Sequence, residues 1–225
     1  IADSGGKPQR VASLLQTFAE HRVEGALYVA PSHQEVNLPK AFGIEHTVIV
    51  NGFDQQSTLS VIPNDYAGQR MLVEQLIAAG HRRIAYLTLP SSLIATVERT
   101  RAWRDALNAA GITPEPEWLC AGDPEIPSLE SENRLQAEAI DHYLSLAKSP
   151  TVICTGNDRM AMRVYGLLRS RGLKVPEDMS VAGYDDHRLI SETLYPQLTT
   201  VELPYRRMGE AAAELLLELI DGGAP

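Results

Sequence analysis

TVICTGNDRMAMRVYGLLRSRGLKVPEDMSVAGYDD, residues 151–186, is the stretch that decides the fold. An apolar strand-like run, TVICT, leads into the polar corner Gly156-Asn157-Asp158, a helix-period segment follows, and a second run, SVAGY, ends at Asp185-Asp186. Such a unit is typical of an open parallel sheet, in which the carboxyl ends of the strands line the ligand crevice. Polar side chains at two successive strand ends therefore favour a small polar ligand.

Strand-like runs alternate with helix-period segments along the whole chain. Between most of the runs, apolar residues recur at helical spacing, as Met160, Val164 and Leu168 do. This alternation predicts an α/β fold with parallel sheets that are covered by helices on both sides. The predicted strands are GALYVA (25–30), HTVIV (46–50), RIAYLTL (83–89), WLCA (118–121), TVICT (151–155) and SVAGY (180–184).

Glycine and asparagine stand where the predicted helices end and begin. Gly80, Gly111 and Gly172 each follow a helix-period segment, where a residue with positive φ is wanted. Asn-Asp pairs at 64–65 and 157–158 stand where N-caps are wanted.

The bulk composition is that of an ordinary globular chain of one or two domains. The 225 residues are 44% hydrophobic and 22% charged, and no apolar run is long enough to cross a bilayer. No secretory signal is visible, so we expect a cytoplasmic protein without a membrane partner. Cys120 and Cys154 lack any partner spacing and are expected to be free thiols. The net charge of −9 opposes phosphate backbones, so this segment is not expected to bind DNA by itself.

The sequence lacks the signatures of the common catalytic and cofactor sites. GxSxG, HExxH, GxGxxG and a complete P-loop are absent, and the six His residues show no metal-ligand spacing. We therefore expect no catalytic residues, no metal and no cofactor. A glycosidase built from Asp123, Glu125 and Asp185 stays open as an alternative, because such enzymes need only two carboxylates at the right separation.

Four longer phrases resemble the effector-binding core of LacI/GalR-type transcriptional regulators. The resemblance implies two Rossmann-like lobes of the type I periplasmic-binding-protein-like kind, with a ligand cleft between them. It places residues 1–89 and 204–225 in the amino-terminal lobe and 90–203 in the carboxyl-terminal lobe. Relative to the family, the first βα unit and the last strand are missing. The phrases are 61–87, 99–112, 156–186 and 195–220.

The resemblance also implies a function. The chain would be the effector-sensing and dimerisation domain of a regulator that binds a sugar or sugar derivative and reaches operator DNA through a missing amino-terminal domain. A homodimer is expected, formed mainly by the amino-terminal lobe and by the unusually apolar helix at 68–79. The alternative is a transport-linked sugar-binding protein of the same fold, and an enzyme is the third hypothesis.

Three ligand-binding residues follow from the family's motifs. Taken alone, Asn157-Asp158 is a helix cap, Asp185-Asp186 a turn and Arg99 a surface charge. The resemblance assigns ligand contacts to the amide of Asn157, with Asp158 as the cap, and to the first carboxylate, Asp185. It assigns Arg99 to ligand oxygens, which a guanidinium fork suits.

Two further candidates are Asp123, in a polar loop, and Tyr205, at the second crossing between the lobes. We expect Arg99→Ala to weaken ligand binding at least about tenfold and Arg101→Ala to change it little. Neither variant is expected to change the stability of the ligand-free fold much.

The sequence departs from the family's pattern at three places. Asn64-Asp65 has the reverse of the usual order, which weakens the case for a ligand contact from that corner but keeps the helix cap. Ala102 replaces the usual Gly after Arg99, and Pro124 replaces an aromatic residue that would cover a sugar face.

Overall fold

The computed structural model describes residues 1–5, 7–38, 44–126 and 128–222, which form two compact units. The first unit comprises residues 1–63 with 204–225, and the second comprises 64–203. Each unit has its own sheet, and every strand pair in both sheets is parallel. The predicted α/β class with two parallel sheets is confirmed.

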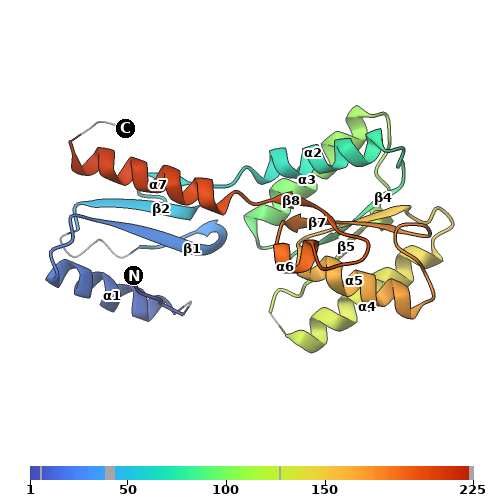
Figure 1. Ribbon diagram of the computed structural model, residues 1–225, viewed down its shortest axis with the longest axis horizontal. Helices are drawn as coiled ribbons and strands as arrows, with labels where there is room; N and C mark the ends of the chain where they lie inside the picture. The colour runs from blue at the N-terminus through green and yellow to red at the C-terminus, as the bar shows by residue number, and fades with distance from the viewer. Residues whose placement is uncertain (6, 39–43, 127, 223–225) are drawn as a thin grey trace. The chain divides into compact units, whose positions relative to one another are not determined.

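The first unit is a small sheet with a helix on each face (Figure 1). Its strands lie in the order β1-β2-β3, with α1 on one side and α7 on the other. Val11 and Leu15 of α1 pack against Ala26 of β1, while Met208 and Ala212 of α7 pack against β2. The elements are α1 (Pro8–Glu20), β1 (Gly25–Glu35), β2 (His46–Phe53), β3 (Ser60–Val61) and α7 (Tyr205–Ile220).

The second unit is a three-layered α/β sandwich around a five-stranded sheet of order β5-β4-β6-β7-β8. Figure 1 shows α2 and α3 on one face of this sheet and α4 and α5 on the other. Its strands are β4 (Ile84–Thr88), β5 (Leu119–Ala121), β6 (Val152–Thr155), β7 (Ser180–Asp185) and β8 (Thr199–Glu202). Its helices are α2 (Asp65–Ala78), α3 (Ile94–Ala109), the 3-10 turn η1 (Pro116–Trp118), α4 (Leu129–Ser145), α5 (Asp158–Ser170) and α6 (Arg188–Ser191).

The predicted helix boundaries of the second unit are confirmed. Gly80, Gly111 and Gly172 have φ of +100°, +71° and +77° just beyond α2, α3 and α5. Asn64 and Asn157 are the N-caps of α2 and α5, and each side chain accepts a hydrogen bond from the backbone N–H three residues later. Local backbone chemistry therefore sets the ends of these helices.

The first crossing between the units lies earlier in the chain than predicted. We assigned 64–89 to the amino-terminal lobe, but α2 and β4 belong to the second unit. The physical reason is that β4 is hydrogen bonded between β5 and β6, and α2 packs along α3. The predicted boundary at Leu89 is therefore wrong, while the second crossing lies between Leu203 and Pro204.

The apolar residues of α2 are largely used within the second unit. Leu72, Val73 and Leu76 are buried, and Ile77 packs against the same core. Two faces of the helix are apolar because α2 contacts both α3 and β8. Among the large apolar side chains of α2, only that of Met71 is exposed, at 49%. The composition of this helix therefore no longer argues for a dimer.

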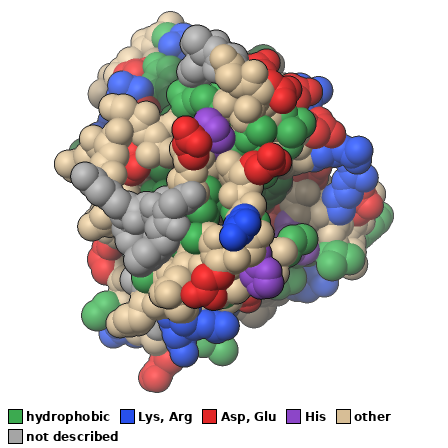
Figure 2. Space-filling model, turned by 90° about the vertical axis from the view of Figure 1, so that its left-hand side faces the viewer, with side chains coloured by type: hydrophobic (Ala, Val, Ile, Leu, Met, Phe, Trp, Pro, Cys, Tyr) green, Lys and Arg blue, Asp and Glu red, His purple; other side chains and the backbone are tan. Residues whose placement is uncertain are grey.

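Charge and hydropathy give two further observations. On the face that Figure 2 shows, Lys and Arg side chains lie in small groups among Asp and Glu side chains. In the ranges that the structure describes, every helix is too short or too polar to span a membrane.

Cys154 is buried and Cys120 partly buried, and both are free thiols, as predicted.

Candidate functional site

Arg99, Asn157 and Asp185 gather at the carboxyl edge of the second unit's sheet. β6 and β7 are adjacent, so the residues that follow them meet at the same edge. Nη1 of Arg99 donates to the carbonyl oxygen of Gly156 at 2.9 Å, directly before Asn157. Cζ of Arg99 lies 3.5 Å from the ring centroid of Tyr184, directly before Asp185. The structure thus brings together three residues that sequence reasoning selected from separate segments.

Arg99 is buried and paired, in contrast to an ordinary surface arginine. Arg99 is only 3% exposed, and its Nε and Nη2 atoms lie 2.7 and 2.6 Å from Oδ1 of Asp65. Removing one partner of such a pair leaves an uncompensated buried charge, which is strongly destabilising. Our expectation that Arg99→Ala leaves the stability of the fold nearly unchanged is therefore wrong.

Asp65 is the site residue that sequence reasoning missed. Asn64 takes the N-cap position of α2, so Asp65 falls in the first turn of the helix and is 2% exposed. There it receives Arg99 from α3, a partner that is distant in sequence. The signal was present in the reversed Asn-Asp order, which we interpreted only as a weakened ligand contact.

Asn157 caps α5, and Asp158 does not have the capping role that we predicted for it. Oδ1 of Asn157 accepts from the backbone N–H of Met160 at 2.8 Å, so Asn157 is the cap and Asp158 is not. In the described part of the chain, no hydrogen bond involves Nδ2 of Asn157, so this amide group can serve a ligand while Oδ1 caps the helix. Asp158 is fully buried and accepts from the backbone N–H of His187 and from Oγ1 of Thr200, at 2.7 and 2.6 Å.

A close approach at Gly183 makes the position of Asp158 possible. A Cβ atom at Gly183 would collide with Oδ1 of Asp158 and with the side chain of Leu198. The absence of a side chain in β7 thus lets the carboxylate of α5 lie directly against the strand.

Asp185 ends β7 in a backbone conformation that L-residues rarely adopt. Its φ is +120°, and Asp186 follows with φ +52°. Such residues persist only where the surrounding structure holds them, and they cluster at ligand sites. Oδ1 of Asp186 accepts from Oγ of Ser191 at 3.0 Å, whereas the carboxylate of Asp185 is coupled to Arg99. The two adjacent carboxylates thus interact with different groups.

The electrostatics of the edge are dominated by a surplus of carboxylates. Asp65 pairs with the buried Arg99, and Asp158, Asp65 and Arg99 all act electrostatically on Asp185. Burial raises the pKa of Asp185 to about 7; Arg99 opposes this shift, and Asp158 and Asp65 add to it. Near neutral pH this carboxyl group therefore exists in both its protonated and its ionised form, and it can donate or accept a hydrogen bond.

The two remaining candidates belong to other elements of the chain. Asp123 follows β5, on the far side of the sheet from β7, and Nε2 of Gln136 donates to it at 3.2 Å. Burial raises the pKa of Asp123. Tyr205 begins α7 in the first unit and is 54% exposed. Their roles in ligand binding stay predictions.

The carboxylates of the glycosidase alternative have separate partners. Glu125 accepts from Oγ of Ser91 and Oγ of Ser92, both at 2.6 Å, and these hydrogen bonds lower its pKa to about 2. Asp123 interacts with Gln136 instead, and Asp185 with Arg99. Within the described ranges, no group of three His, Cys, Asp or Glu side chains is arranged to hold a metal. The geometry gives the enzyme hypothesis no support.

Comparison with known proteins identifies similar chains. Residues 73–225 match the model of the periplasmic binding protein-like domain. The HTH-type transcriptional repressor PurR of Aliivibrio fischeri (strain MJ11) is 33% identical over 225 residues, covering 98% of this chain and 64% of the relative. PurR of Vibrio cholerae is 31% identical over 223 residues, with 98% and 64% covered. The chain thus spans about 64% of the length of these curated relatives.

Solved structures of regulators show the same fold. A LacI-family transcriptional regulator protein from Rhizobium etli has a TM-score of 0.87 and 33% identity, covering 100% of this chain and 80% of that one. The complex of the transcriptional regulator CelR with cellobiose has a TM-score of 0.78 and 28% identity, covering 97% and 66%. These similarities extend over both sheets of the chain.

Proposed function

Because the chain belongs to the periplasmic binding protein-like domain family and carries the effector-binding core of LacI/GalR regulators, we propose that it senses an uncharged, hydroxyl-rich ligand. The ligand is a sugar or sugar derivative that binds at the carboxyl edge of the second unit's sheet. Asp185 and Nδ2 of Asn157 make the direct hydrogen bonds to the ligand. Arg99 stabilises the conformation of the carboxyl edge through its contacts with Gly156 and Tyr184. Asp123 and Tyr205 supply further contacts.

The surplus of carboxylates around Asp185 is the observation that carries this proposal. Like charges in a partly buried site repel strongly, so an anionic ligand such as a sugar phosphate would meet Asp185, Asp65 and Asp158 at a high cost. Sugar hydroxyls, in contrast, both donate and accept hydrogen bonds. They match the carboxyl group of Asp185 and the amide group of Asn157.

A structural neighbour supports the sugar class. CelR, which is 28% identical, forms a complex with cellobiose. The PurR relatives are transcriptional repressors, and this favours a regulator over the transport-linked alternative. An enzyme is not proposed.

The proposed mechanism is a shift between conformations of a larger regulator. A ligand favours one conformation only as far as it binds that conformation more tightly. The net charge of −9 makes this segment a poor partner for DNA, so operator contacts would come from a part of the regulator outside this sequence. Such a protein would act in the cytoplasm.

We also propose a homodimer, as the family resemblance implies. Sedimentation velocity at tens of micromolar tests this proposal, and a monomer at that concentration would contradict it.

Titration calorimetry with neutral and anionic sugars tests the ligand class. We expect cellobiose or another neutral sugar to bind and the corresponding sugar acids and phosphates to bind more weakly. Asp185→Asn should raise the dissociation constant of the neutral sugar by about one to two decades, because a hydrogen bond to a charged group contributes roughly 1.5–3 kcal/mol. Glu177→Gln, at an exposed carboxylate of the same unit, is the matched control and should leave affinity unchanged. Binding of anionic ligands alone would contradict the proposal.

A further inference from the structure

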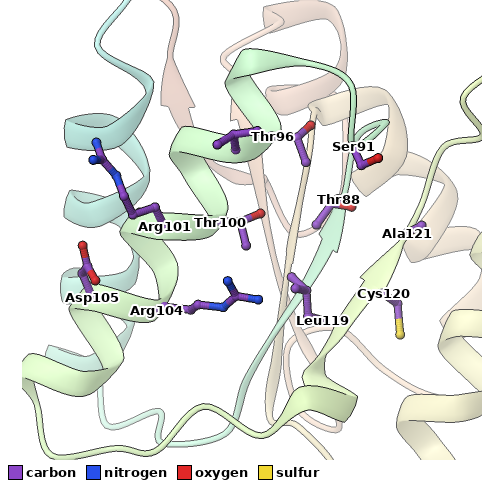
Figure 3. Close-up of a pocket in the computed structure, with 11 residues that line it drawn as sticks. Thr88, Ser91, Thr96, Thr100, Arg101, Arg104, Asp105, Leu119, Cys120 and Ala121 are labelled. Carbon is purple, nitrogen blue, oxygen red and sulfur yellow. The ribbon is translucent and has the colours of Figure 1, made fainter.

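A cavity lies in the second unit, and neither Arg99 nor Asp185 lines it. It has a volume of about 520 Å³ and is bounded by α3, the end of β4 and the edge strand β5 (Figure 3). Small-molecule sites occupy roughly 300–1,000 Å³, so the cavity is large enough for a metabolite. None of the residues selected by the family's motifs lines it.

One polar stripe of α3 faces this cavity. Thr96, Thr100 and Arg104 are spaced four residues apart, and all three line the cavity. Such spacing places side chains on one face of a helix. Figure 3 shows Thr100 and the guanidinium of Arg104 reaching from α3 toward Leu119 of β5.

Arg104 is the cation of this cavity that is left for a ligand. Arg101 points the other way in Figure 3, pairs with Glu98 and lies over the ring of Tyr66, with 4.6 Å from Cζ to the ring centroid. Oδ2 of Asp105 accepts from the hydroxyl of Tyr66 at 2.9 Å. Over the described ranges, Arg104 makes no salt bridge, and its guanidinium can therefore bind an anion.

An orphaned hydroxyl group points to a missing partner. Thr96 is only 6% exposed, and its Oγ1 is buried without a hydrogen bond among the described residues. Thr88, at the carboxyl end of β4, adds a second buried threonine to the same lining at 7% exposure. A buried hydroxyl without a partner is unfavourable, so native structures rarely keep one unless water or a ligand supplies the hydrogen bond.

We propose that the α3–β5 cavity binds a second ligand, a small anion that also carries hydroxyl groups. Its phosphate or carboxylate group pairs with Arg104, whose planar fork of donors fits either group. Its hydroxyls hydrogen bond with Thr96 and Thr100, and its carbon atoms lie against Leu119. The carboxyl edge around Asp185 has a surplus of carboxylates, whereas this cavity has an unpaired guanidinium, so the two sites select ligands of different charge.

Calorimetric titration of the whole chain with three small probes tests the site. Glycerol 3-phosphate and glycerate carry the anion and hydroxyl groups, and glycerol is the neutral control. We expect the anions to bind and glycerol not to bind, and comparison of the two anions distinguishes phosphate from carboxylate. Arg104→Gln should weaken the anions by about tenfold to a hundredfold, as expected for the loss of a charged hydrogen bond.

Two variants separate binding from structural effects. Thr96→Val keeps the shape and removes the orphaned hydroxyl, so it should weaken the anions without lowering the melting temperature. Arg134→Gln makes the same charge change on the exposed face of α4 and should leave the affinity unchanged.

Three results would overturn the proposal. The first is no binding of either anion up to about 10 mM. The second is equal affinity in wild type and Arg104→Gln. The third is a loss of anion binding in Asp185→Asn but not in Arg104→Gln, which would place the anion at the carboxyl edge. Because the two sites share no residue, failure here is distinguishable from failure of the proposed sugar site.

Discussion

Two of the three arginines of helix α3, Arg99 and Arg104, have different surroundings. On one side Arg99 is buried and engaged by Asp65, Gly156 and Tyr184. On the other side Arg104 reaches into a cavity beside a threonine whose hydroxyl has no partner in the described structure. The same side chain can thus hold a site in shape where its donors are used, or remain available for a ligand where they are not. Residue type alone does not distinguish the two.

The largest expected effect is on stability, at the buried pair. Arg99→Ala should lower the free energy of unfolding by about 3–5 kcal/mol, because the buried carboxylate of Asp65 would lose its ion pair with the guanidinium. Arg101→Ala is the control; its ion pair with Glu98 is largely exposed and should contribute at most about 1 kcal/mol. Urea denaturation measures both variants.

A double variant sharpens this prediction. Arg99→Met with Asp65→Leu removes both charges and should recover much of the lost stability, since apolar replacement of a buried pair is often neutral. A loss below about 1 kcal/mol in Arg99→Ala alone would show that Asp65 is not held as the structure indicates.

The next effect is the pH dependence created by Asp185. Its pKa of about 7 exceeds that of an unfolded Asp, about 4, so the folded state retains a proton that the unfolded state has released. The contribution of Asp185 to stability is therefore full below about pH 4 and is lost as the pH rises to about 7. Asp185→Asn should remove this decline. Melting temperatures of wild type and variant, measured between about pH 4 and pH 7, test this expectation.

Ligand affinity should show the opposite trend with pH. If sugar hydroxyls donate to the ionised carboxylate, affinity rises as the pH increases through about 7, and the Asn variant shows no such rise. An affinity of the wild type that is independent of pH between about 5 and 9, about two units on either side of this pKa, would mean that Asp185 does not contact the ligand.

Two variants of Asn157 separate its cap from its amide donor. Asn157→Ala should cost about 1 kcal/mol of stability through loss of the N-cap, and it should also weaken the ligand. Asn157→Asp retains an oxygen for the N–H of Met160 and should keep the stability, but it loses Nδ2 and so should still weaken the ligand. Equal ligand affinity in wild type and Asn157→Asp would limit Asn157 to capping.

Local signals predicted the elements of this fold well, and long-range pairing accounts for the main errors. β-branched runs located β4, β6 and β7, and Gly80, Gly111 and Gly172 marked helix ends, because backbone preference decides both features. The boundary at Leu89 failed because the position of β4 depends on pairing with two strands that come later in the chain.

The site was predicted in part for the same reason. Strand ends are visible in a sequence, so Asn157 and Asp185 were found. The Asp65–Arg99 pair joins two helices that are separated in sequence, and the reversed Asn-Asp order at 64–65 was the sole signal for it that we identified. The α3–β5 cavity left no sequence signal either, because Thr96, Thr100 and Arg104 form a stripe that any solvated helix face would show.

The smallest expected effect is also on stability, at the second arginine. Arg104→Gln should change the free energy of unfolding by less than about 0.5 kcal/mol, because an exposed arginine without a carboxylate partner contributes little to the folded state. The free energies of unfolding of Arg104→Gln and Arg99→Ala, both measured by chemical denaturation, compare the two faces of α3 directly. A loss above about 1 kcal/mol in Arg104→Gln would mean that its guanidinium has a structural partner in solution, and the contrast with Arg99 would then fail. A negligible loss combined with weaker anion binding would instead assign Arg104 to ligand recognition, since it would affect binding without affecting folding.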